Sequence, residues 1–531
     1  MRVGQALVEL LQDYGVELVF GIPGTHSLEV YRGLSANGIR HVLPRHEQGA
    51  GFMADGYARI SGKPGVCFVI TGPGVTNIAT PLGEAYLDAV PMLVVSPVNP
   101  HAAGRKNHGR LHEITDQAAV TRPLTAFSDT ALQAADIPRL VARAFAVFAG
   151  ERPAPVHINI PLPVLQETVT DSWRPVPPPA RPAPAPAQLA TCAQMLAQSA
   201  NTVIVAGGGA RAAATQVVAL AEHLAAPVLA TVAGRGIIDA SHELCPGGQL
   251  RAEPVQALLA HADVALLLGT DLAEPDHWND ALAVPAQQIR VNLDGDALLA
   301  GPETIGLRAD IGITVDALLE ACVPATAAQR TAAGQRCAES RTAIAGARDA
   351  KTDLHRHVVR RMLDILPHDA IVVSDMTQIA YTAVDFIPLR HSQQWLHPTG
   401  YGTLGYALPA AIGAKLAAPA RKVVVLAGDA GFQYTGQEMA VAAELGMDIA
   451  VVLWNNDALQ QIKDDMLGAQ FEPLAVTQRN PDFGTWAQAC GWLSGVANDL
   501  PNFARQLTDA LANEDRCSLI QLNEKALSAS Q

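Results

Sequence analysis

Short runs of Val, Ile and Leu alternate along this chain with longer, alanine-rich stretches that have helical patterning. Continuous apolar runs of this length predict strands buried on both faces, and such strands belong to parallel sheets covered by helices. We therefore predict an α/β fold with doubly wound parallel sheets. The runs on which the prediction rests are Val66–Ile70, Met92–Val95, Val203–Val205, Val264–Leu268, Ile371–Val373, Val423–Leu426 and Ile449–Leu453.

Two breaks in this pattern divide the chain. Residues 166–187 are rich in proline and alanine, which predicts an extended, semi-rigid linker rather than a helix or a central strand. Residues 321–352 lack hydrophobic runs and form a connector, either helical or coil. The length of 531 residues agrees with about three domains. We place them at residues 1–165, 188–320 and 353–531.

Composition excludes several classes of protein. The net charge of −14 argues against nucleic-acid binding and against docking on anionic lipid. No apolar run approaches the ~20 residues that span a bilayer, and Glu9, Asp13 and Glu17 interrupt the N-terminus, which is therefore not interpreted as a signal peptide. Seven scattered cysteines without a CxxC pair argue against disulfides or zinc. We expect a cytoplasmic protein.

A candidate phosphate and metal site lies where two predicted strands of the last block end. The strand over Val423–Ala427 leads into the small-residue turn Gly428–Phe432, ahead of a helical pattern from about Thr435 to Leu445. Such a turn exposes backbone N–H groups at a helix start, which suits a phosphate. The next strand ends in Trp454–Asp457. Asp429 and an asparagine amide thus reach one sheet edge, with the oxygen ligands that Mg²⁺ prefers.

This pair of turns resembles the thiamin-diphosphate signature, Gly-Asp-Gly followed by Asn-Asn, because 24 residues separate Ala430 from Asn455. The match departs at Ala430, which replaces the second glycine. Alanine would be strained there if the position needs a positive φ, but it keeps the N–H. The resemblance implies that Mg²⁺ is bound by Asp429, Asn456 and the backbone oxygen of Ala458. It also implies that Gly428, Ala430, Gly431, Thr377 and Gln378 contact the diphosphate.

Residues 20–98 resemble the pyrimidine-binding domain of the same family. The resemblance implies that Glu47 shares a proton with the aminopyrimidine ring and so activates the cofactor. It further implies that Leu404 supports the bent cofactor from below, and that the Gly402 carbonyl accepts from its amino group. The motifs are Phe20–Gly24, Arg45–Ala50, Met53–Arg59 and Thr71–Asn77, in which Arg45, His46, Asp55, Arg59 and Asn77 are expected to be structural.

The whole chain resembles the superfamily of acetolactate synthases and 2-oxo acid decarboxylases. The synthases carry an Arg-Phe-Asp-Asp-Arg element tied to a flavin and a Thr-Lys-His element near the site. The corresponding stretches here are Leu268–Asp276 and Thr125–Phe127, which contain neither. We therefore do not expect FAD. The turn Gly207–Gly209 leaves open whether the middle domain binds a nucleotide, although a purely structural turn is favoured.

Residues of one predicted helix in the last block indicate the class of substrate. Where the synthases place Met, Val and Trp, an ungapped alignment puts Gln461, Ile462 and Asp465, with Asp464 adjacent. Gln461 and Asp465 share a helix face because they are four residues apart. A carboxylate in place of an apolar wall indicates a substrate with a cationic tail, such as a guanidinium. A solvated helix end would explain the same acids.

Four stretches make the chain similar to 5-guanidino-2-oxopentanoate decarboxylase. This resemblance implies non-oxidative decarboxylation of a small 2-oxo acid to an aldehyde and CO₂. Two alternatives stay open: a flavin-free, acetolactate-synthase-like carboligase, and a cofactor-binding relative without activity. The stretches are Phe20–His26, Arg45–Tyr57, Ser374–Tyr381 and Gly402–Gly413.

Two features concern the end of the reaction and the oligomer: the acid that protonates the product, and the number of chains that assemble. His26, His108, His112 and Gln117 are candidates for the proton donor, and the sequence does not choose among them. His26 and His112 are also expected near the substrate. Because active sites of this family form between chains, we expect at least a homodimer and, by the same resemblance, a homotetramer.

Overall fold

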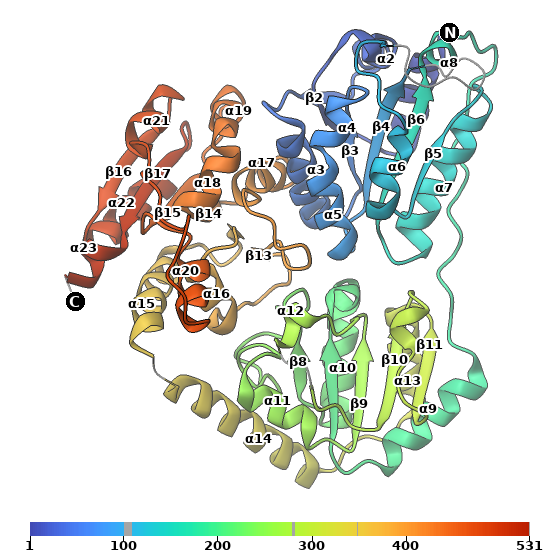
Figure 1. Cartoon of the computed structure of the whole chain (residues 1–531). Coiled ribbons are helices and arrows are strands. Elements are labelled where there is room, and N and C mark those ends of the chain that lie inside the picture. Colours follow the sequence, from blue (N-terminus) through green and yellow to red (C-terminus); the bar gives the residue numbers. More distant parts are fainter. Residues whose placement is uncertain (100–108, 279–281, 348, 530–531) are drawn as a thin grey trace.

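The computed structural model describes residues 1–99, 109–278, 282–347 and 349–529. Three parallel sheets organise the chain, each with helices beside it (Figure 1). The strand orders are β2-β1-β3-β4-β6-β5 in the N-terminal domain, β11-β10-β9-β7-β8 in the middle domain and β13-β12-β14-β15-β17-β16 in the C-terminal domain. This confirms the predicted fold class, and each predicted strand is found in a sheet.

The strands that form these sheets are short, and most are buried along their length. In chain order they are β1 (Leu18–Gly21), β2 (Arg40–Val42), β3 (Gly65–Phe68), β4 (Met92–Val98), β5 (Phe127–Thr130), β6 (Pro155–Pro161), β7 (Thr202–Ala206), β8 (Val228–Ala230), β9 (Val264–Leu268), β10 (Gln287–Asn292), β11 (Thr304–Arg308), β12 (Ile371–Ser374), β13 (Trp395–Leu396), β14 (Val423–Gly428), β15 (Ala450–Asn455), β16 (Leu493–Ala497) and β17 (Ser518–Asn523).

The helices supply the crossovers between parallel strands. They are α1 (Val3–Asp13), α2 (Leu28–Asn37), α3 (Glu47–Ser61), α4 (Pro73–Asn77), α5 (Ala79–Leu87), α6 (Gln117–Thr121), α7 (Asp136–Gly150), α8 (Leu162–Gln166), α9 (Pro186–Gln198), α10 (Ala214–Leu224), α11 (Glu253–Ala260), α12 (Glu274–His277), α13 (Ile311–Ala321), α14 (Ala327–Gly346), α15 (Ala350–Ile365), α16 (Gln378–Phe386), α17 (Ala407–Ala417), α18 (Asp429–Thr435), α19 (Met439–Glu444), α20 (Gln460–Gly468), α21 (Phe483–Ala489), α22 (Leu500–Ala512) and α23 (Glu524–Ala529).

The two proposed connections differ in structure. The proline-rich stretch runs without helix or strand from residue 173 to residue 185 and passes from the N-terminal to the middle domain along the right side of Figure 1. Helix α9 then begins at Pro186, since proline is tolerated in the first turn. The second connection is helical, because α14 spans Ala327–Gly346 below the middle domain and leads to the C-terminal domain.

The N-terminal sheet is buried on both faces, as its continuous apolar strands predict. Along β4, Leu93 and Val95 belong to one hydrophobic cluster, which includes residues of α1, α2 and α7. Val94 points to the other face, toward α3 and α5. This second cluster continues into the C-terminal domain and includes Val373 and Val425. The two domains therefore share one core.

Helices α3 and α17 form the centre of this shared core, and their backbones approach closely. A Cβ atom at Gly56 would lie 2.0 Å from the Ala410 carbonyl oxygen, and one at Gly413 would lie 1.9 Å from that of Met53. Only glycine allows such contact. This packing places the N-terminal domain directly beside the C-terminal domain, on which the predicted diphosphate turn lies.

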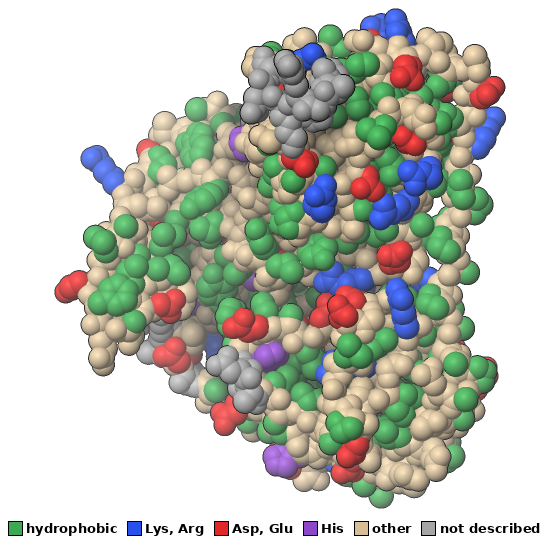
Figure 2. All heavy atoms as spheres, turned by 45° about the vertical axis from the view of Figure 1, so that its right-hand side comes forward, with side chains coloured by type: hydrophobic (Ala, Val, Ile, Leu, Met, Phe, Trp, Pro, Cys, Tyr) green, Lys and Arg blue, Asp and Glu red, His purple; other side chains and the backbone are tan. Residues whose placement is uncertain are grey.

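Charges of both signs cover the surface. On the face that Figure 2 shows, Lys and Arg side chains lie interspersed with Asp and Glu rather than in one broad basic patch. In the part of the chain that the structure describes, no helix is long and apolar enough to cross a membrane.

Candidate active site

The Gly-Asp turn of the C-terminal domain is the first turn of a helix. The pattern had predicted a helix from about Thr435, but α18 begins at Asp429, directly after β14. Ala430 therefore has helical backbone angles and is not among the residues with positive φ. The strain considered for alanine at this position does not arise, and its N–H stays at the helix start, where an anion is favoured.

Several residues predicted to contact the diphosphate lie around this helix start. A Cβ at Gly428 would lie 2.8 Å from Thr377 Oγ1, and one at Gly431 would lie 3.1 Å from Asp375 Oδ2 and 3.5 Å from Leu404 Cδ2. The two glycines thus leave a narrow cradle that a side chain would fill. Burial raises the pKa of Asp375 to about 6, and its carboxylate accepts from the backbone N–H of Gly405.

A set of oxygen atoms converges beside Asp429. The Nδ2 group of Asn480 donates to Asp429 Oδ2 at 2.6 Å, to Asn455 Oδ1 at 2.9 Å and to Asp457 Oδ1 at 3.1 Å. Asp429 also accepts from the backbone N–H of Asp457. Burial raises the pKa of Asp429, whereas the hydrogen bond from Asn480 lowers it. Three oxygens therefore gather around the Asn480 amide nitrogen at the end of β14 and β15.

This donor set fits Mg²⁺ chemistry. In the described parts of the chain, no three or more His, Cys, Asp or Glu side chains are placed to hold a metal ion. A cation here would rely on few carboxylates together with amide, backbone and phosphate oxygens, which is how Mg²⁺ binds beside a diphosphate. The Asn456 side chain, predicted to be a ligand, accepts from the Ala458 N–H at 3.3 Å.

Asn480 was not identified from the sequence. It lies 51 residues from Asp429, so no local spacing links the two. The sequence signal there is an Asn-Pro pair, which marks a loop without indicating what the loop contacts.

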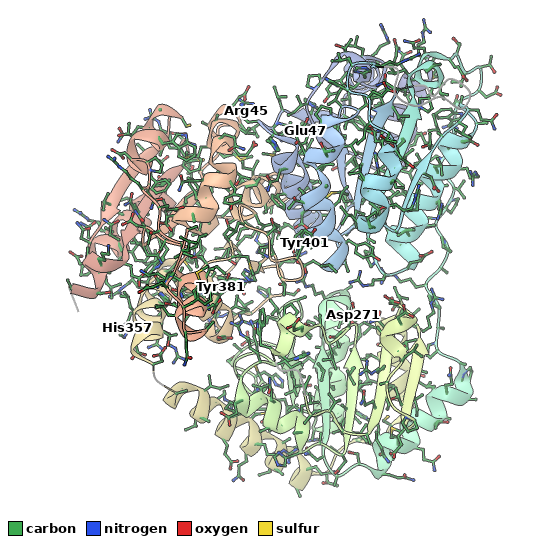
Figure 3. All side chains as sticks on the ribbon, viewed as in Figure 1. Arg45, Glu47, Asp271, His357, Tyr381 and Tyr401 are labelled. Carbon is green, nitrogen blue, oxygen red and sulfur yellow. The ribbon has the colours of Figure 1, made fainter. Side chains whose placement is uncertain are left out.

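Glu47 is the first residue of α3 and is only 6 % exposed. Its Oε2 accepts a hydrogen bond of 2.9 Å from Asn77 Nδ2, at the end of α4. His46 caps the helix, since its Nδ1 accepts from the Gln48 N–H, and the Arg45 N–H donates to Glu438 of the C-terminal domain. Figure 3 shows Glu47 on α3 of the N-terminal domain.

The turn that carries Gly402 and Leu404 is held by acids of the N-terminal domain. Asp88 accepts from the N–H groups of Thr399 and Gly400, and Glu84 Oε2 accepts from the Thr403 N–H. Arg59 joins Asp88 to Asp55 in a buried ion-pair network, and Tyr406 donates to Asp55. Burial, followed by the neighbouring Asp88 carboxylate, raises the pKa of Glu84 to about 10.

Gln117 is structural rather than a proton donor. Its Oε1 accepts from Thr71 Oγ1 and the Gly72 N–H, and its Nε2 donates to Ser96, Pro97 and Asn159. All these groups are interior. Gln117 therefore fixes the start of the loop that ends at the Glu47 partner, Asn77.

The two described histidine candidates lie together. The rings of His26 and His112 have centroids 5.1 Å apart, and neither Nδ1 has a hydrogen-bond partner in the described part of the chain. Burial and then His112 lower the pKa of His26. The His112 carbonyl oxygen lies 2.5 Å from where a Cβ at Gly72 would be. His112 is therefore close to the segment that Gln117 fixes and that leads to Asn77. His108 falls outside the described residues.

Four predicted substrate residues lie on α20, and two of them, Gln461 and Asp464, contact α16. Gln378 Nε2 donates to Asp464 Oδ2 at 2.8 Å and to Gln461 Oε1 at 3.2 Å. Gln461 donates in turn to Asp465 at 3.0 Å, which confirms that these two share a helix face. Ile462, predicted to line the substrate, is 48 % exposed.

The glycine turn of the middle domain is bonded internally. The N–H groups of Gly207 and Gly209 donate to the carbonyls of Leu268 and Gly269. A Cβ at Gly207 would lie 2.2 Å from the Gly269 oxygen. Close packing between two strand ends explains these glycines without a nucleotide.

Family models match three parts of the chain: the N-terminal TPP binding domain of thiamine pyrophosphate enzymes over residues 1–120, their central domain over 189–318 and their C-terminal TPP binding domain over 375–522. Together with the fold, the glycine cradle and Glu47, these matches show that the chain belongs to the thiamine pyrophosphate enzyme family.

The chain is also similar along most of its length to individual members of this family. The chain is 50 % identical over 511 residues to the "Probable 2-ketoarginine decarboxylase AruI" of Pseudomonas aeruginosa, covering 96 % of this chain and 91 % of the relative. It is 32 % identical over 538 residues to the acetolactate synthase large subunit of Lactococcus lactis, with 98 % and 92 % covered. An acetolactate synthase of Mycobacterium bovis is also 32 % identical, over 520 residues, with 92 % and 82 % covered.

Proposed function

We propose that this enzyme is a Mg²⁺-dependent decarboxylase of a 2-oxo acid with a cationic, guanidino-type tail, releasing an aldehyde and CO₂. The observation that carries the proposal is the pair of acids on α20, of which Asp464 meets Gln378 next to the predicted diphosphate residue Thr377. The relative named for 2-ketoarginine supports the same chemistry. A planar guanidinium pairs bidentately with a carboxylate.

Thiamin diphosphate, when bound, supplies the electron sink for loss of CO₂. Glu47 would hold a proton at the pyrimidine ring, with Asn77 fixing its carboxylate. The Gly402 carbonyl would accept from the ring's amino group, and Leu404 would pack beneath the cofactor. His26 and His112 remain candidates to protonate the product carbon, because the Nδ1 atoms of both rings have no hydrogen-bond partner in the described residues and His112 lies against Gly72, just before α4 and Asn77.

At the other end of the cofactor, the N–H groups of α18 would bind the diphosphate. Asp429, Asn456 and the Ala458 backbone oxygen would hold Mg²⁺. Asn455 and Asp457, which share the Asn480 amide with Asp429, supply further oxygens beside it. The bonded N–H groups of Gly207 and Gly209 support an enzyme without FAD.

A homodimer, and from it a homotetramer, is part of the proposal. As the family resemblance implies, Glu47 of one chain would face the diphosphate turn of a second chain. Apolar side chains exposed on and after α20 support such a contact: Ile462, Leu467, Phe471 and Leu474.

The test is a decarboxylation screen over 2-oxo acids with guanidino, aliphatic and aromatic tails, run with wild type and Asp465→Asn. Loss of a charge-assisted contact costs about 1.5–3 kcal/mol, so the preference for the guanidino acid should fall about 10- to 150-fold. Asp509→Asn, an exposed acid on α22, is the control and should leave the preference unchanged. Equal loss on charged and neutral substrates would reject the acidic pocket. Acetolactate as the main product from pyruvate would favour the carboligase.

A further inference from the structure

Helix α16 connects the middle domain to the candidate substrate residues. Its nine residues span on the order of 13 Å, and it lies beside α20 in the C-terminal domain, above the middle domain (Figure 1). Its amino end presents Gln378 to Asp464 and Gln461. Its carboxyl end contacts side chains of the middle domain. One rigid element therefore links two distant regions.

Three middle-domain side chains bind the carboxyl end of this helix. Arg235 donates to the carbonyls of Val384 and Ile387, and Gln249 also donates to the Val384 carbonyl. Arg251 forms an ion pair with Asp385 and donates to the Tyr381 carbonyl at 2.6 Å. The last carbonyls of a helix lack partners within it, so the donors to Val384 and Ile387 satisfy groups that would otherwise be orphaned, whereas Tyr381 lies within the helix.

The charge of these donors suits their position. The carboxyl end of a helix carries partial negative charge, which a guanidinium stabilises. Arg235 is 7 % exposed, and although burial lowers its pKa to about 10, it stays positive at neutral pH. A buried cation is retained only where its surroundings compensate it. Here the compensation comes from the end of α16 and from Asp385.

The amino end of α16 carries the residues whose positions depend on the contacts at its carboxyl end. The Gln378 side chain is 7 % exposed, its Nε2 bonds both α20 residues, and its Oε1 has no partner in the described residues. Thr377, just before the helix, lies against Gly428 of the diphosphate turn. A shift of α16 along its axis would move both residues together.

We propose that Arg235 and Arg251 are positioning residues through which the middle domain fixes α16, so that Gln378 holds the α20 acids in the arrangement that selects the substrate. This inference rests on the proposed function for its catalytic consequence. The middle domain of this chain thereby contributes to substrate specificity through α16, without contacting the substrate itself.

The test compares Arg251→Ala with Arg152→Ala. Arg152 is a matched control, because its side chain is 22 % exposed against 18 % for Arg251. Like Arg251, it donates to backbone carbonyl oxygen and pairs with an aspartate across a domain boundary, at Asp271. Amide hydrogen exchange of residues 378–386 in the full-length enzyme should become at least 10-fold faster in Arg251→Ala and should not change in Arg152→Ala. Unchanged exchange, or an equal effect of both variants, would overturn the anchoring.

The consequence for specificity is measured as the ratio of kcat/KM for a guanidino 2-oxo acid to that for an uncharged acid of similar length. The ratio should fall at least five-fold in Arg251→Ala and partly recover in Arg251→Lys, which keeps a positive donor. Because the effect acts through Gln378, Arg251→Ala combined with Gln378→Ala should lose no more than Gln378→Ala alone. Additive losses would overturn the inference. A wild type without preference for the charged acid would reject the proposed function, and the exchange result would still decide the anchoring.

Discussion

Replacing Glu84 by glutamine should stabilise this enzyme at neutral and alkaline pH. Glu84 is fully buried beside Asp88, and its pKa is raised from 4.5 to about 10. The folded protein therefore keeps a proton that the unfolded chain loses above about pH 4.5. Keeping that proton costs about 1.4 kcal/mol for each pH unit above 4.5, or about 4 kcal/mol at pH 7.5.

Glutamine removes this cost while preserving the contacts. It is neutral at every pH, as the protonated acid is, its carbonyl can accept from the Thr403 N–H, and its amide can donate toward Asp88. The value of about 4 kcal/mol is an upper limit, because Asp88 responds to the proton on Glu84. At about 2 °C per kcal/mol for domains of this size, the melting temperature should rise by several degrees at pH 7.5.

The assay is thermal unfolding of wild type and Glu84→Gln from pH 5 to pH 9. The sign follows from the raised pKa: stability from protonated Glu84 is fully present below pH 4.5 and is lost as pH rises toward 10. The difference between the two proteins should therefore be small at pH 5 and grow with pH. Glu17→Gln, at an exposed position, is the control and should show no such trend. A difference independent of pH, or a destabilised variant at pH 8, would refute the reasoning.

Two further predictions concern the cofactor. Glu47→Gln should bind thiamin diphosphate and keep its melting temperature but lose at least about 100-fold in turnover, as expected for a lost acid–base group; steady-state kinetics showing a loss below three-fold would contradict this role. Asp429→Asn should lose the rise in melting temperature that Mg²⁺ with thiamin diphosphate gives the wild type, because a buried anionic oxygen is removed from the cluster around Asn480; a Mg²⁺-dependent rise equal to that of wild type would show that the metal binds elsewhere.

The sequence predicted what depends on local pattern. Strands such as β9, with the bounds Val264–Leu268, follow from continuous apolar runs, because residues buried on both faces of a sheet must all be apolar. Glu47 and Asp429 were found through ordered motifs with fixed spacing. The helix start at Asp429 was placed too late, since glycine and aspartate have low helix propensity and the pattern alone does not show that the first turn of a helix tolerates them.

Contacts between distant segments could not be predicted. Asn480 meets Asp429 across 51 residues, and Gln378 meets Asp464 across 86. Glu84 looks like an ordinary surface acid in the sequence, yet α5 buries it against the turn that carries Leu404. Such partners are brought together by the packing of whole domains, which short-range spacing does not encode.

By itself, then, the sequence determined the three α/β units and the residue types that a diphosphate, a metal ion and a cationic tail would need. Those properties follow from periodicity and motif chemistry, which are local. Only the tertiary structure decided that α3 and α17 merge two domains into one core, that Gln117 is structural, and that α16 joins the middle domain to the α20 acids. These contacts form because surfaces of distant segments are buried against each other and away from water. Which surfaces are buried together depends on the whole folded chain.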